Sequence, residues 1–159
     1  MFTDTQYYDL FEELAMKHVS IQHSSSRIRF FKTPDEVPDK DLANEFYMIL
    51  LPPTYDYADL NSDNLIERIR GEFLILKPVE RENYNEALNT RTEAREIARN
   101  ILSRLQKLRK EKLFNEFTIG QSRGNPIGPI LENCHGVSYE FIIGDSAGIF
   151  YNPQNWIDG

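Results

Sequence analysis

The chain has 159 residues, a length that predicts one domain spanning residues 1–159. Its 25 acidic residues outnumber its 18 basic ones, and the net charge of -7 argues against a dedicated nucleic-acid coat protein, which would carry a basic excess. The single cysteine, Cys134, excludes an internal disulfide, and three histidines are too few for most zinc sites.

Neither a leader nor a membrane span is expected. The first residues, Met1 to Asp4, are polar and acidic, whereas a secretory signal has a basic start and an apolar middle. The longest apolar run, Phe46 to Leu51, is far shorter than the roughly 20 residues that a membrane helix needs. We therefore expect a soluble protein that is made in the cytoplasm and has no membrane partner.

The first expected elements are a helix and a strand. Thr3 or Asp4 can cap a helix that runs to about Val19, because its apolar side chains recur at three- and four-residue steps. After a serine-rich turn, alternating side chains predict a strand from Arg27 to Lys32. A short helical turn is expected between residues 39 and 46.

The next segment is typical of a long hairpin. Tyr47 to Leu51 is apolar at every position, which predicts a strand covered on both faces. Thr54 to Asn64 is polar and is expected to form a loop, so that an extended polar hairpin loop spans about residues 52–66. Leu65 to Val79 alternates as a strand, with Gly71 as a bulge.

The clearest element is an amphipathic helix that begins near residue 85 or 90 and ends at Leu113, with a basic last turn. Because few strand pairs are separated by a crossover helix, we expect an α+β fold: a mostly antiparallel sheet with this helix and the N-terminal helix packed on it. The shorter elements expected after the long helix are a strand around Phe117, a loop from Gly120 to Pro129, a strand from Val137 to Ile143, a turn at Gly144 to Gly148 and a return strand from Ile149 to Tyr151.

Cys134 and His135 are the one pair of neighbouring residues that could act as nucleophile and base. Adjacent residues of a strand point to opposite faces, so these two cannot form a dyad with each other. A distant His18 or His23 could still approach Cys134, but a buried structural thiol is the favoured interpretation. No serine-hydrolase, zinc-protease or phosphate-loop motif occurs, and we predict no catalytic residue and no cofactor.

Asp59, Asn61 and Asp63 match the first half of a calcium-binding loop, in which oxygen ligands alternate. The second half fails, because Asn64 stands where the loop needs glycine and Arg70 stands where it needs glutamate. The pattern favours a solvated acidic hairpin tip over a metal site, and leaves open whether these three residues bind a cation.

Arg91, Arg95 and Arg99 follow one another at four-residue steps on the long helix, and such like charges repel. One interpretation is a solvated helix face. The other is that an acidic surface covers the row. Residues 1–64 hold 12 acidic and 5 basic residues and so carry the whole net charge, whereas the remaining chain holds 13 of each.

This asymmetry suggests that copies of the chain assemble head to tail, with the acidic third of one copy against the arginine row of the next. The candidate interface residues are those of the helix row and of the polar hairpin: Arg91, Arg95, Arg99, Asp56, Asp59, Asp63, Tyr55 and Tyr57.

The order of elements resembles that of the tail-terminator and tail-completion (neck) proteins of tailed phages. The likeness rests on the leading helix, the strand pair with its polar loop from Tyr47 to Val79, the helix from Arg91 to Leu113, and the closing segment in which Pro126 to Asn133 precedes a strand from His135 to Phe141. The resemblance covers most of the chain as architecture and involves no signature motif.

The resemblance implies a non-enzymatic structural protein of the virion, assembled in the host cytoplasm as a hexameric ring. Such a ring caps the tail tube, meets the head-side connector protein and lets DNA pass through an acidic lumen. The loop from Thr54 to Asn64 would then contact a neighbouring subunit or the tube protein. Head completion and other neck roles stay open, as does the type of tail.

Two other classes of function remain. One is a small adaptor that binds a partner through exposed aromatic residues such as Tyr55, Tyr57, Tyr151 and Trp156. The other is a small enzyme whose site joins Cys134 to a distant histidine.

Overall fold

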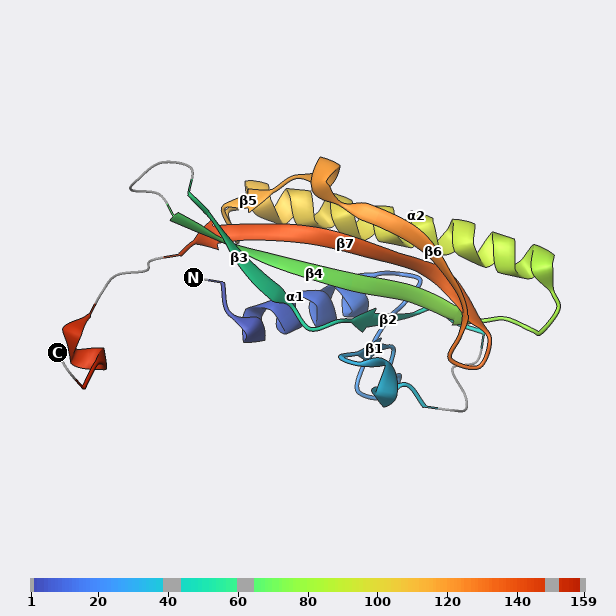
Figure 1. Cartoon of the computed structure of the whole chain (residues 1–159). Helices are drawn as coiled ribbons and strands as arrows, with labels where there is room; N and C mark the ends of the chain where they lie inside the picture. Colours follow the sequence, from blue (N-terminus) through green and yellow to red (C-terminus); the bar gives the residue numbers. More distant parts are fainter. Residues whose placement is uncertain (1, 39–43, 60–64, 148–151, 158–159) are drawn as a thin grey trace.

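The computed structural model describes residues 2–38, 44–59, 65–147 and 152–157 (Figure 1). The first element, α1, spans Asp4–Lys17 and begins with a capping box, in which Thr3 and Gln6 exchange side-chain to backbone hydrogen bonds. The backbone turns extended at His18, so the helix ends slightly before the expected Val19.

The sheet contains seven strands among the described residues, in the order β1-β2-β4-β7-β5, with β3 also paired to β4 and β6 also paired to β7. Every pairing is antiparallel except that of β1 with β2. The strands are β1 (Phe30–Phe31), β2 (Tyr47–Leu50), β3 (Thr54–Asp59), β4 (Leu65–Pro78), β5 (Glu116–Phe117), β6 (Arg123–Ile130) and β7 (Cys134–Ser146).

Strands β4 and β7 form the long axis of the sheet. They pair without interruption from Ile66 opposite Ser146 to Pro78 opposite Cys134. The other edge of β4 is shared by β2 and β3, which are separated by the pair Pro52-Pro53. All four residues of β2 are buried, which confirms the strand covered on both faces.

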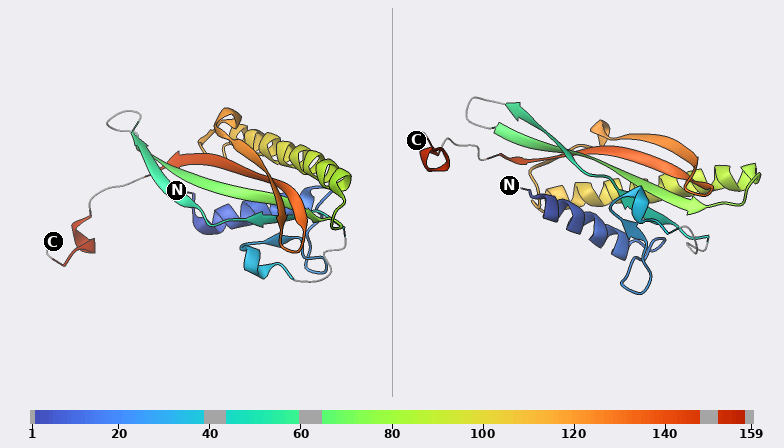
Figure 2. Two further views of the ribbon diagram at one scale, coloured as in Figure 1. Left: turned by 45° about the vertical axis from the view of Figure 1, so that its right-hand side comes forward. Right: turned by 60° about the horizontal axis from the view of Figure 1, so that its bottom comes forward.

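Helix α2, Tyr84–Lys110, lies beside α1 on one face of the sheet (Figure 2). Phe11 of α1 stacks on Phe141 of β7 with ring centroids 4.8 Å apart, and Ile101 of α2 belongs to the same buried cluster. The expected α+β architecture, a mostly antiparallel sheet with both helices packed on it, is therefore confirmed.

The opposite face of the sheet is covered over part of its length. A second, smaller cluster lies there around Tyr47, Leu74 and Cys134. The partly buried side chains packed against it are Val37, which follows the 3-10 turn η1 (Pro34–Glu36), Leu51, Ile127 and Leu131. Further along β4 and β7 this face carries polar side chains and stays open to solvent, which is where the groove described below lies.

Several predicted boundaries were wrong, mostly at sheet edges. The strand expected from Arg27 to Lys32 is reduced to Phe30–Phe31. Thr54–Asp59, expected as loop, is strand β3, because its backbone pairs with β4. Most of the loop expected from Gly120 to Pro129 is likewise strand, because β6 pairs with β7. An edge strand tolerates Pro126, since one side of its backbone needs no partner.

The glycines of the central strands serve close packing. At Gly71 the β4–β7 register has no bulge, contrary to expectation. A side chain there would meet the Phe141 ring and lie 2.5 Å from the Tyr7 hydroxyl oxygen. Gly144 continues β7, where a turn was expected. The return strand expected from Ile149 to Tyr151, and most of the helical turn expected between residues 39 and 46, lie outside the described residues.

None of the helices in the described part of the chain is both long enough and apolar enough to cross a membrane.

Candidate functional site

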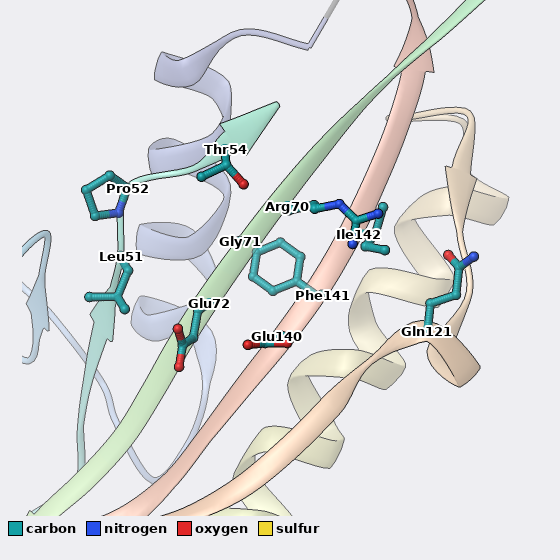
Figure 3. Close-up of a pocket in the computed structure, with 10 residues that line it drawn as sticks. All are labelled: Leu51, Pro52, Thr54, Arg70, Gly71, Glu72, Gln121, Glu140, Phe141 and Ile142. Atoms are coloured by element: carbon teal, nitrogen blue, oxygen red, sulfur yellow. The ribbon is translucent and has the colours of Figure 1, made fainter. Parts of the chain in front are cut away.

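A groove of about 300 Å³ lies on the uncovered face of the sheet (Figure 3). Glu72 of β4 and Glu140 of β7 are direct partners in the register, so their side chains lie side by side on this face. The groove is lined by Leu51, Pro52, Thr54, Arg70, Gly71, Glu72, Gln121, Glu140, Phe141 and Ile142.

The two glutamates of this groove differ in their partners. Glu72 accepts a hydrogen bond from the Ser138 hydroxyl. Glu140 makes no hydrogen bond or ion pair with any other described residue. Arg70, the nearest cation along β4, is already paired with Asp56. The groove therefore offers carboxylate oxygens to hydrogen-bond donors of a partner, and no group of three potential metal ligands occurs among the described residues.

A second cleft, of about 200 Å³, separates α2 from the edge strand β6. Arg91 and Arg95 stand on its helix side, and the Tyr139 ring, which lies against Gly124 of β6, forms part of its floor. We call it the arginine cleft; its lining is Arg91, Thr92, Arg95, Gly124, Asn125, Pro126, Val137 and Tyr139.

The two arginines of this cleft are not equivalent. Nη2 of Arg91 donates to the carbonyl oxygen of Gly128 at 3.2 Å, which ties α2 to β6. The Nε of Arg91 is buried without a hydrogen-bond partner in the described residues. Arg95 is exposed, and its guanidinium has no hydrogen-bond or ion-pair partner in the described part of the chain. A carboxylate entering the cleft would meet both groups.

Arg99 lies outside the arginine cleft and pairs with Glu96 at 3.4 Å on its own helix. The reason is helical geometry, since each four-residue step overshoots a full turn by about 40° and places Arg99 about 80° around the helix from Arg91. The row of three predicted from the sequence is thus a pair at a cleft and a third arginine with a local partner.

The polar hairpin is more ordered than expected, and we call its described residues, 54–59 and 65–70, the arm. The arm extends past the ends of both helices (Figure 1). Tyr55 and Tyr57 are about half exposed, at 48% and 53%. Their hydroxyls donate to Asp4 and, at 3.0 Å, to Glu67. The hydrogen bond to Asp4 raises the pKa of Tyr55 to about 12.

The acidic residues of the arm have different positions. Asp56 forms an ion pair with Arg70 across the β3–β4 pairing, and Asp59 is the last residue of β3. Asn61 and Asp63, the rest of the half calcium loop, lie outside the described residues, so the structure does not assemble that pattern. In the structure, the arm and the arginine cleft lie on different parts of one molecule. A head-to-tail contact between copies would need two such separate surfaces.

Cys134 has the surroundings of a structural thiol. Its side chain is 2% exposed, and its sulfur accepts a hydrogen bond from the Tyr47 hydroxyl at 3.2 Å while its own S–H points at the Leu131 carbonyl, 3.1 Å away. Burial raises the pKa of the Cys134 thiol, whereas a nucleophilic cysteine needs a lowered pKa. None of these contacts brings His18 or His23 to the sulfur.

Sequence reasoning missed the glutamate pair of the sheet groove. The alternation within Leu65–Val79 does place Glu72 on the polar face, but its neighbour Glu140 follows only from the β4–β7 register, which is a long-range pairing.

No protein-family model matches the chain, and no curated protein matches it at a significant level.

Proposed function

We propose that this protein is a non-enzymatic structural subunit of a homo-oligomeric ring, of the kind that caps the tail tube of a phage and joins it to the head-side connector. The proposal builds on the resemblance in element order and on the arrangement of charge. It implies a location in the virion, the tail-tube and connector proteins as partners, and DNA only in passage.

One observation carries the assembly part of the proposal. The arm carries the half-exposed Tyr55 and Tyr57 and the acidic positions Asp56 and Asp59 at one end of the molecule, while the arginine cleft on α2 holds the guanidinium of Arg95, which has no partner among the described residues. Two complementary surfaces on different parts of one chain give a heterologous contact, which closes into a ring when the rotation between copies allows it. An arm carboxylate of one copy against Arg95 of the next satisfies both charges.

Charge reversal tests this contact. Arg95→Glu is expected to shift the population to monomers, because it places a carboxylate opposite the acidic arm, whereas Arg99→Glu is the matched control on the same helix outside the cleft. Native mass spectrometry measures both. Reversal on the arm, Asp59→Arg, should restore assembly when it is combined with Arg95→Glu. Equal effects of the two single reversals would refute the contact.

An adaptor that binds a different protein is the second candidate, and the exposure of Tyr55, Tyr57 and Trp156 is the observation that favours it. A chain that stays monomeric at every concentration, and whose assembly state is indifferent to Arg95→Glu, would favour this alternative.

A further inference from the structure

Two large apolar side chains are exposed on α2 next to the arginine cleft. Tyr84 is 78% exposed and Leu88 is 57% exposed. Because the helix has 3.6 residues per turn, both lie within about 20° of the line that runs along the helix through Arg95. An apolar pair that continues a charged cleft has the composition of an interaction surface. We call these three residues the α2 strip.

The charged half of the α2 strip needs the apolar half for affinity. An ion pair between exposed side chains contributes little to binding, because water and salt screen it. In protein interfaces most of the affinity comes from a few aromatic and apolar anchors that lose their contact with water. A partner that reaches Arg95 therefore binds stably when it also covers Leu88.

The arm carries the matching groups on one of its faces. The β3–β4 register sets Tyr57 opposite Glu67, and the Tyr57 hydroxyl donates to the Glu67 carboxylate at 3.0 Å. An exposed ring and a carboxylate are thus joined in one unit. Tyr55 lies two residues away on the same face, but its hydroxyl is bonded to Asp4 of its own α1. Tyr57 is therefore the tyrosine of the arm whose ring is tied only to the arm itself.

The arm and the α2 strip of one molecule are too far apart to meet. Tyr57 lies opposite Glu67 of β4, whereas Tyr139, in the floor of the arginine cleft, lies opposite Phe73. These six steps along β4 measure about 20 Å. From the second arginine of the cleft, α2 runs about 10 Å back to Leu88, toward the end of the sheet with the β6–β7 turn and away from the arm (Figure 1). Only the arm of another copy can cover the strip.

We propose that Tyr57 in the arm of one copy packs its ring on Leu88 of a second copy, beside Tyr84, while the acidic residues of that arm meet Arg95. The inference rests on the proposed contact between the arm and the arginine cleft, and it identifies the apolar anchor of that contact. The apolar half of the α2 strip then supplies affinity, and the charged half fixes the orientation of the arm.

Alanine variants of the full-length protein test the anchor. Leu88→Ala and Tyr57→Ala should each raise the concentration of half-assembly about tenfold in sedimentation velocity. Tyr57→Phe should stay within about twofold of the unmodified chain, because the ring makes the contact and the hydroxyl does not. Met16→Ala, which removes an apolar side chain of 53% exposure outside the strip, is the matched control. Alanine is the best helix former, so Leu88→Ala keeps α2 intact.

The double variant shows whether the two side chains touch. If Leu88 and Tyr57 form one contact, the effect of Leu88→Ala combined with Tyr57→Ala should fall short of the product of the single effects by about threefold or more. Met16→Ala combined with Tyr57→Ala should give the full product. A full product for the first pair would overturn the contact.

Cross-linking provides an independent measurement. A Tyr57→Cys chain mixed with a Leu88→Cys chain of different tag length should be joined by a short bis-maleimide, whereas the native Cys134 is buried and stays in place. Gln106→Cys, exposed on the same side of α2 about 27 Å from Leu88, should not be joined. A link within one monomeric chain that carries both cysteines would mean that the arm folds onto its own helix, which overturns the contact between copies.

The outcomes separate this inference from the proposed function. An oligomer that assembles at the same concentration in Leu88→Ala and Tyr57→Ala, and gives no cross-link, refutes the anchor and leaves the ring intact. Weaker assembly in Leu88→Ala alone would mean that another segment covers the α2 strip, such as the one that bears the exposed Trp156, and would overturn the role of the arm. An unmodified chain that is monomeric at every concentration refutes both the anchor and the ring.

Discussion

The hydroxyl of Tyr7 in α1 donates a hydrogen bond to the backbone carbonyl of Leu51 at 2.8 Å. Leu51 is where the chain leaves β2 for the Pro52-Pro53 break and the arm. The hydroxyl oxygen of Tyr7 also lies close to Gly71, at the point where β4 passes from the core into the arm. One side chain of the first helix thus fixes the base of the arm on two strands, and burial raises its pKa well above that of a free phenol.

Tyr7→Phe is expected to lower the free energy of unfolding by about 1–2 kcal/mol, because the Leu51 carbonyl loses its buried donor while the ring still fills its place. Urea denaturation followed by circular dichroism measures the change. Tyr8→Phe is the control, since the Tyr8 hydroxyl makes no hydrogen bond within the described residues. An equal loss from both variants would contradict the role of the Tyr7 hydroxyl.

Gly71→Ala should destabilise the protein by about 1–3 kcal/mol, the range typical of overpacking. The added methyl group would overlap the Phe141 ring and the Tyr7 hydroxyl, both of which are held in the core. Gly120→Ala is the matched change, because its methyl group would have 3.9 Å to the nearest atom. Thermal unfolding compares the two, and a Gly71→Ala protein as stable as Gly120→Ala would show that the contact can relax.

Cys134 should resist thiol reagents in the folded protein. Its sulfur is buried beneath Tyr47 and Leu131, and burial raises its pKa, so that little reactive thiolate exists at neutral pH. The expected reaction with an aromatic disulfide reagent is at least 100-fold slower than in denaturant. Rapid labelling without unfolding would revive the enzyme alternative, which needs an accessible thiolate.

The free energy of unfolding should vary with pH through the titration of Glu45. Hydrogen bonds from Arg27 and Arg29 lower its pKa below the ordinary glutamate value of about 4.5. The folded state therefore binds its proton less readily than the unfolded state does, so the Glu45 contribution is present above about pH 4.5 and is lost as the pH falls through the lowered pKa. The unfolding free energy of the Glu45→Gln variant, measured between pH 3 and 6, should lack the pH dependence that Glu45 contributes. Glu80→Gln, a change at an exposed glutamate, is the control. An unchanged slope would show that the arginine pair does not act on Glu45.

The elements that the sequence predicted well are those with a strong local period. Helices α1 and α2 carry apolar side chains at helical spacing, and β2 is apolar at every position, so burial dictates their structure. Strands β3 and β6 are polar or rich in proline and glycine, and only their pairing with β4 and β7 makes them strands. Such pairing joins distant parts of the chain and leaves no local signal.

The candidate site also has a part that the local sequence predicted and a part that depends on long-range packing. The sequence predicted an arginine row, and the structure places Arg91 and Arg95 at a cleft because β6 lies beside that part of α2. A groove of about 230 Å³ between α1 and α2 was not predicted, since it exists only where Leu14 of one helix lies near Ile101 of the other. Both surfaces depend on how the helices pack against the sheet and against each other. The periodicity of side chains within one element carries no information about that packing.

The native mass of the full-length, unmodified chain across the micromolar range tests the central claim most directly. The proposed contact between the arm of one copy and the arginine cleft of the next predicts one closed species, with no open series of larger masses, and the resemblance to tail-terminator proteins implies six copies in it. A monomer that persists at every concentration would contradict the account.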